Sequence, residues 1–110
     1  MIIALPTKTS GEKAFISENL GRANYFYIYD TNKSDGKSYI NNFQNEAHGA
    51  GVKTAEFLMK YSTDILITPR IGEKALEILL DTDIKIYKAT EKIARENIND
   101  FLNNKLEELY

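Results

Sequence analysis

The sequence predicts an α/β fold with a five-stranded mixed sheet in the order 3-2-1-4-5, an antiparallel second strand, and three helices on both faces. Short apolar runs of strand length recur along the chain, and after residue 50 they alternate with stretches that have the period of an amphipathic helix. Before residue 50, two strand-like runs flank a cluster of turn residues, which is the pattern of a β-hairpin.

The first half of the chain predicts three strands and one long loop. Ile2–Leu5 is a wholly apolar run ended by Pro6, as expected for a central strand that is buried on both faces. Residues 7–24 keep no period and are rich in small polar residues, which predicts a loop, and loops of that length are more often functional than idle. Tyr25–Tyr29 and Ser38–Asn42 should pair as a hairpin around the turn residues between them, Asn32, Lys33, Ser34, Asp35 and Gly36.

The second half predicts two strands, at Ile65–Ile67 and Ile84–Tyr87, between three helices. The apolar faces expected for the first two helices are Val52, Ala55, Leu58 and Met59, then Ala75, Leu76, Leu79 and Leu80. Thr90 should cap the last helix. Asn103 and Asn104 should end it, because Asn tolerates the left-handed conformation found at helix ends. Residues 105–110 should form a loosely held tail.

The predicted topology brings several loops to one edge of the sheet. Strands joined through a helix run parallel, with right-handed crossovers, so the first, third, fourth and fifth strands should share one direction. The loops that follow these strands then open at the same edge, together with the start of the second strand. Ligands bind at that edge in open α/β sheets.

Composition excludes several classes of function. With 110 residues, the chain should form a single domain over residues 1–110. Its net charge of -2 and its scattered lysines and arginines give no basis for binding nucleic acid, and no apolar run is long enough for a membrane. Cysteine is absent, which excludes thiol catalysis and thiolate ligands. Because no signal peptide is visible, we expect a cytoplasmic protein.

Three segments at the predicted ligand edge carry a family pattern. They read Ser17-Glu18-Asn19-Leu20-Gly21-Arg22-Ala23-Asn24-Tyr25-Phe26, His48-Gly49-Ala50-Gly51 and Ile67-Thr68-Pro69-Arg70-Ile71-Gly72. In this order and spacing the chain resembles the family of dinitrogenase iron-molybdenum cofactor biosynthesis proteins, in particular its small single-domain members. The resemblance implies a ribonuclease H-like fold and a role in binding an iron-molybdenum-type or related metal-sulfur cluster during its assembly or storage. Asn19 stands where the family pattern has His, and Pro69-Arg70 replaces a pair that contains Gly.

The candidate binding residues come from these segments: His48, Arg22, Gly21, Gly49, Gly51, Arg70 and Gly72. His48 is the expected metal ligand, because it is the only histidine and precedes a helix start that favours anions. The alternative is a histidine that only hydrogen-bonds a neighbouring loop. Arg22 offers a planar fork of donors to a sulfide-rich or oxyanionic ligand, or else pairs with Glu18 on the surface.

The roles of the other candidates stay open at this stage. Gly49 and Gly51 either clear space for a ligand or only allow a tight start to the helix. Arg70 adds bulk and positive charge to the mouth of the site. We expect His48, Arg22 and Arg70 to converge on one cleft. The series Tyr25, Tyr27 and Tyr29 is better explained by packing in the core than by stacking on nucleic-acid bases.

Two functions fit these observations. The first is a non-catalytic binding or carrier protein for the cluster, with a cluster-donor or acceptor protein as a possible partner. The second is a regulatory module that binds a small anion or a protein on the same fold without a metal cluster. A nuclease is excluded, because Ile2–Leu5 supplies none of the carboxylates that two-metal chemistry needs. No nucleophile and base stand together in the sequence, so we expect no enzyme.

Overall fold

The computed structural model describes residues 1–110, and all five strands belong to one sheet in the order β3-β2-β1-β4-β5. The elements are β1 (Ile2–Thr7), β2 (Tyr25–Asp30), β3 (Asp35–Ile40), α1 (Ala50–Lys60), β4 (Ile65–Thr68), α2 (Glu73–Leu79), β5 (Lys85–Lys88) and α3 (Ala94–Leu102). The strand order predicted from the sequence is confirmed. None of the three helices is long and apolar enough to span a membrane.

The strand directions are also those predicted. β1 pairs in parallel with β4, and β4 in parallel with β5, while β2 is antiparallel to both of its neighbours. Thr7 at the end of β1 therefore pairs with Tyr25 at the start of β2, which in turn pairs with Ile40 at the end of β3. The loops after β1, β3 and β4 consequently leave the sheet at one edge.

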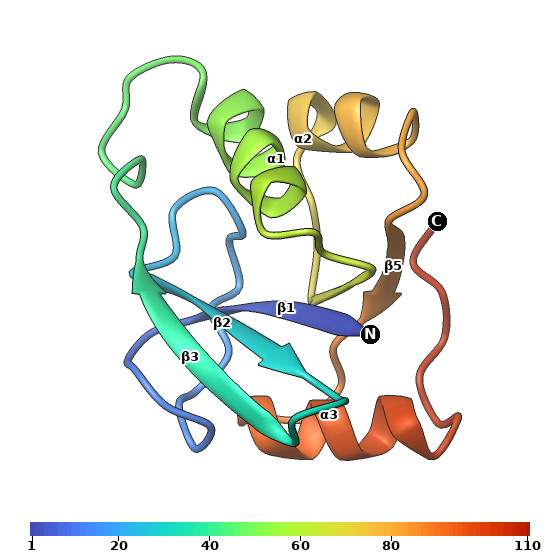
Figure 1. Ribbon diagram of the computed structural model, residues 1–110. Helices are drawn as coiled ribbons and strands as arrows, with labels where there is room; N and C mark the ends of the chain where they lie inside the picture. The colour runs from blue at the N-terminus through green and yellow to red at the C-terminus, as the bar shows by residue number, and fades with distance from the viewer.

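Helices cover both faces of the sheet, as Figure 1 shows: α1 and α2 lie side by side on one face and α3 on the other. The alternation of β2 divides its side chains between two cores. Phe26 and Ile28 pack on the α1 and α2 side, whereas Tyr27 and Tyr29 pack on the α3 side. This arrangement confirms the packing explanation for Tyr27 and Tyr29.

All five strands differ from their predicted bounds by one to three residues, and β1 and β3 differ most. β1 continues through Pro6, because the Pro6 carbonyl faces away from β2 and accepts a bond from the Ser17 amide, so the missing Pro6 N–H costs no bond to β2. β3 begins at Asp35 rather than Ser38, because the turn closes earlier: Ser34 takes the left-handed conformation with φ 51 and Asp35 already pairs with Asp30.

The helical faces were partly mispredicted. Val52, Met59 and Leu80 are exposed, at 37%, 40% and 61%. The buried face of α1 is centred instead on Thr54, Ala55 and Leu58, since the Thr54 hydroxyl donates to the Ala50 carbonyl and can therefore enter the core. Apolar periodicity alone could not reveal a buried threonine.

The C-terminal region differs from the prediction at two points. Ile93, not Thr90, precedes α3, and the Asn97 side chain holds the preceding loop through the amides of Thr90 and Glu91. The tail is not loose, because Leu106 is buried and backbone bonds join residues 107–109 to β5. The predicted end of α3 is confirmed: the helix stops at Leu102, and Asn104 has φ 59.

Candidate functional site

A hollow of about 370 Å³ lies where the loop after β1 meets the turn after β4. Its lining residues are Asn19, Leu20, Arg70, Ile71 and Gly72. The turn is held in shape by the buried Thr68, whose hydroxyl donates to the Arg70 carbonyl at 2.9 Å. Two of the motif-bearing segments therefore form the two walls of one surface hollow.

The Arg70 guanidinium is a largely exposed cation beside this hollow. It forms an ion pair with Glu18 from the opposite loop, with 3.5 Å between Nη2 and Oε2, and the two side chains are 74% and 78% exposed. Such an exposed pair contributes about 1 kcal/mol or less, so an anionic ligand could replace Glu18 at little cost. The alternative that Arg22 pairs with Glu18 is wrong, because Arg70 holds that position.

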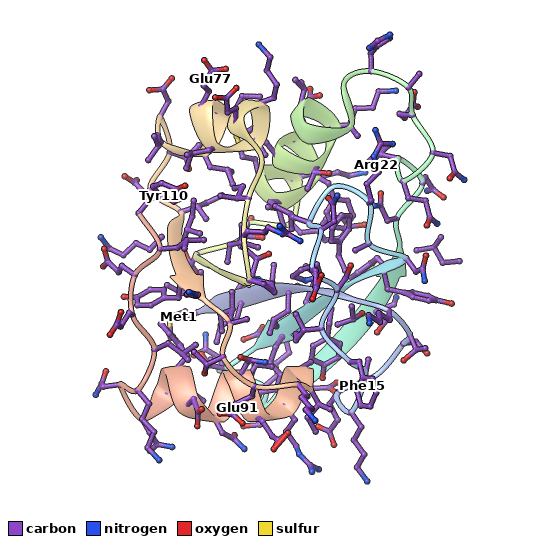
Figure 2. All side chains as sticks on the ribbon, turned by 180° about the vertical axis from the view of Figure 1, so that it is seen from behind. Met1, Phe15, Arg22, Glu77, Glu91 and Tyr110 are labelled. Atoms are coloured by element: carbon purple, nitrogen blue, oxygen red, sulfur yellow. The ribbon has the colours of Figure 1, made fainter.

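Arg22 instead ties together two loops at the same edge. Its Nη1 donates to the carbonyl oxygens of Gln44 at 2.8 Å and Glu46 at 2.6 Å, and its own amide donates to the Asn19 side chain. Figure 2 shows Arg22 against the loop that precedes α1. Nη1 of the guanidinium is therefore occupied by two carbonyl oxygens of this loop.

Asn41 is a further positioning residue that the motif comparison missed. Only 1% of it is exposed, and its Nδ2 donates to the carbonyls of Gly21 at 3.0 Å and Ala23 at 2.9 Å. Its Oδ1 accepts a bond from the Phe43 amide at 2.8 Å. Asn41 thus fastens the start of the 41–49 loop to the loop that carries Arg22. No sequence pattern signals this role, since the residue follows a strand like any turn asparagine.

His48 lies at the far end of the 41–49 loop. Its imidazole is exposed and makes none of the hydrogen bonds that hold the loop. Gly49 follows with φ 81, a left-handed conformation that permits the sharp turn into α1, and the helix start has no side-chain cap. The ring is therefore accessible from solvent beside a helix start.

The other glycines differ in what surrounds them. A Cβ on Gly51 would lie 3.2 Å from the Ala75 amide nitrogen, so the absence of a side chain there serves the close packing of α1 on α2. A Cβ on Gly21 would make only ordinary contacts at 3.9 Å, and one on Gly72 would meet open space. Close packing explains Gly51, and the left-handed turn explains Gly49.

The loop before His48 also carries a perturbed carboxyl group. A hydrogen bond from Lys53 to Glu46, at 2.9 Å, together with the Lys53 charge lowers the pKa of Glu46, and the Arg22 charge adds to the effect. The loop is therefore held at Glu46 by two cations, one from α1 and one from the 17–24 segment.

The predicted site residues thus lie on neighbouring segments of one edge, but only some share the hollow. Arg70 and Gly72 line it, whereas Arg22 makes the adjoining contact between the 17–24 and 41–49 loops. His48 takes part in neither, so the predicted convergence of His48, Arg22 and Arg70 on one cleft is not found. No group of three or more His, Cys, Asp or Glu side chains could hold a metal ion. A single ion bound by several protein ligands therefore does not fit here, whereas the exposed Arg70 beside the hollow is suited to an anionic group.

Comparisons with known proteins agree with the motifs. The sequence model of the family described as dinitrogenase iron-molybdenum cofactor matches residues 1–104. An uncharacterized protein of Methanocaldococcus jannaschii is 30% identical over 110 residues, covering 97% of this chain and 90% of the relative.

Two solved structures show the same fold. The orange protein from Desulfovibrio gigas, in its apo form, superimposes with a TM-score of 0.91 at 27% identity, covering 97% of this chain and 91% of that one. A NifB-like protein from Thermotoga, assigned to the DUF35 family, gives a TM-score of 0.86 at 30% identity, covering 98% and 92%.

Proposed function

The chain belongs to the dinitrogenase iron-molybdenum cofactor family, and from that premise we propose that it is a non-catalytic carrier of an iron-molybdenum-type or related metal-sulfur cluster. The cluster is its cargo, bound during assembly or storage. The observation that carries the proposal is the hollow between Asn19 and Gly72, with an exposed arginine beside it, at the edge that holds all three family motifs.

The chemistry of the edge supports cargo that arrives preassembled. Without cysteine, and without a group of three ligating side chains, the protein has nothing on which to build a cluster atom by atom. Arg70 offers charge and hydrogen bonds to an anionic cluster, and His48 offers a single ligand. The exposed imidazole also has no hydrogen-bonded Ser or Asp beside it, which supports a role without catalysis.

Anaerobic titration of the purified protein with isolated iron-molybdenum cofactor tests this function. His48→Ala should abolish loading and leave the fold intact, since His48 is an exposed loop residue.

Arg70 and Arg95 provide a matched pair for the same titration. Both are arginines in a surface ion pair with a glutamate, but Arg95 pairs with Glu12 away from the hollow. Arg70→Ala should weaken loading about tenfold through the loss of a charged hydrogen bond, and Arg95→Ala should not change it. Equal affinities for His48→Ala and the unchanged protein would refute the ligand role.

The second candidate function is a small-anion or protein-binding module on the same edge. The absence of cysteine and of a group of three ligating side chains favours it. In that case phosphate or molybdate should bind with an affinity that depends on Arg70 and not on His48. A titration with these two anions therefore distinguishes it from the cluster carrier.

A further inference from the structure

We propose that the free edge of β3 and the aromatic groove beside it dock an extended, acidic segment of a partner protein. β3 is the last strand of the sheet on its side, and Figure 1 shows no element beyond it. One side of its backbone therefore has no partner strand. An extended segment can add to such an edge through main-chain hydrogen bonds.

A groove of about 470 Å³ runs from this edge to α1. Aromatic and apolar side chains form much of its lining: Tyr39, Ile40, Phe43, Phe57 and Tyr61, with Lys60 beside them. Ile40 is 62% exposed and extends the apolar lining to the free edge of the sheet. A second hollow of about 310 Å³ shares Phe43, Phe57 and Lys60 with the first and extends it along α1.

The aromatic lining is rigid enough to receive side chains from a partner. The tilted rings of Tyr39 and Tyr61 lie 4.6 Å apart between centroids, and Phe57 lies 4.7 Å from Tyr61 and 5.0 Å from the buried Phe26. The rings are therefore anchored in the core through Phe26. Pockets between such rings suit alternate apolar side chains of an added strand.

Lysines determine the sign of charge that this groove accepts. Lys37, Lys53 and Lys60 each lie over an aromatic ring, at 5.4 to 5.8 Å from its centroid. Lys53 is paired with Glu46, but no salt bridge involves Lys37 or Lys60. Glu56 lines the second hollow between Lys53 and Lys60, but Lys60 is the only charged residue that lines the groove beside β3, and Lys37 lies over its Tyr39 ring. The groove beside β3 is therefore locally positive on a chain whose net charge is -2, and this favours acidic residues in the partner.

A second copy of the chain fits the edge less well. An antiparallel pair of β3 strands centred on Lys37 would place two lysines opposite each other, and like charges on adjacent strands are destabilising. Lysine at a sheet edge also discourages pairing with uncharged strands. An acidic partner segment would instead be attracted by the lysines at this edge.

The test uses two fluorescein-labelled peptides, Glu-Thr-Val-Thr-Phe-Thr-Glu and the same peptide with Lys in place of Glu. Alternate residues of an added strand share one face, so the two Glu, the Val and the Phe of the first peptide can all face the groove. Fluorescence anisotropy with the full chain, free of any cluster, should show binding of the acidic peptide and none of the basic one. Lys37→Glu and Lys60→Glu should each weaken binding about tenfold. Lys85→Glu, at the opposite edge strand, is the matched control and should have no effect.

Two further variants test the charge of the groove and its apolar edge separately. The doubly reversed variant, Lys37→Glu with Lys60→Glu, should bind the basic peptide in preference, and Ile40→Asp should weaken both complexes while circular dichroism shows an intact fold. Equal binding of the acidic peptide by all variants would overturn the proposal. So would tight binding of an oligouridylate instead of the peptide, or a dimer in sedimentation that Ile40→Asp dissociates.

Discussion

Replacement of the buried Asn41 tests whether one amide holds the two loops of the candidate site together. Asn41→Ala removes three hydrogen bonds, two donated to the carbonyls of Gly21 and Ala23 and one accepted from the Phe43 amide. The bond to Ala23 is fully buried, so its carbonyl would lose its partner at the full cost of about 1–3 kcal/mol. The other two groups are partly buried and would regain water at a cost of about 0.5–1 kcal/mol each.

The free energy of unfolding should therefore fall by about 3 kcal/mol, a large part of the roughly 5–15 kcal/mol that stabilises a typical domain. Urea denaturation followed by circular dichroism measures this change. Asn42→Ala is the matched control, because Asn42 is exposed and should change stability by less than about 0.5 kcal/mol. A loss below about 1 kcal/mol for Asn41→Ala would refute the reasoning.

Asn41→Asp separates the loss of donors from the loss of volume. The carboxylate can still accept the Phe43 amide, but it places negative charge about 3 Å from two carbonyl oxygens. At neutral pH it should therefore be at least as destabilising as Asn41→Ala. Part of the lost stability should be recovered at low pH, where the protonated acid can donate one hydrogen bond. Greater stability of Asn41→Asp at neutral than at low pH would contradict this account.

Three further predictions follow from single contacts. Gly49→Ala should destabilise by about 1–2 kcal/mol in urea denaturation because φ is 81 there, whereas Gly21→Ala should be close to neutral. Lys53→Met should return the lowered pKa of Glu46 toward its ordinary value, as NMR titration of the carboxyl carbon would show; an unchanged pKa would exclude Lys53 as the cause. Burial, then the charges of nearby carboxylates, raises the pKa of Tyr27, so the folded state holds this proton more tightly. This contribution to stability is complete below pH 10 and is lost as pH rises through the raised pKa, which ultraviolet titration of tyrosinate in Tyr27→Phe and the unchanged protein measures.

The strand order could be predicted because it depends on signals that are local in the chain. Apolar runs such as Ile65–Ile67 and the helical period that follows them define each unit, and the right-handed crossover leaves few ways to assemble the units. The predicted helical faces failed where a polar group enters the core, as Thr54 does. Its burial depends on a bond to the Ala50 carbonyl, which hydrophobic periodicity cannot represent.

The site was predictable only at the level of segments. Topology placed the loops of Arg22, His48 and Arg70 at one edge, and the structure has them there. Topology could not predict that Glu18 pairs with Arg70 rather than Arg22, because Arg22 is only four positions from Glu18 in the chain and Arg70 is fifty-two positions away. That pairing depends on how the turn after β4 approaches the loop after β1.

The sequence by itself determined the elements, their order in the sheet and the edge at which the motifs meet, because these depend on periodicity and on the handedness of the backbone. Only the tertiary structure decided which atoms of those motifs face a ligand. Arg22 is turned toward the carbonyls of Gln44 and Glu46, and Asn41 fastens the same loop, through bonds between residues about twenty positions apart. Such bonds form where folding brings loop carbonyls beside a side-chain donor, and no local pattern in the chain encodes that meeting.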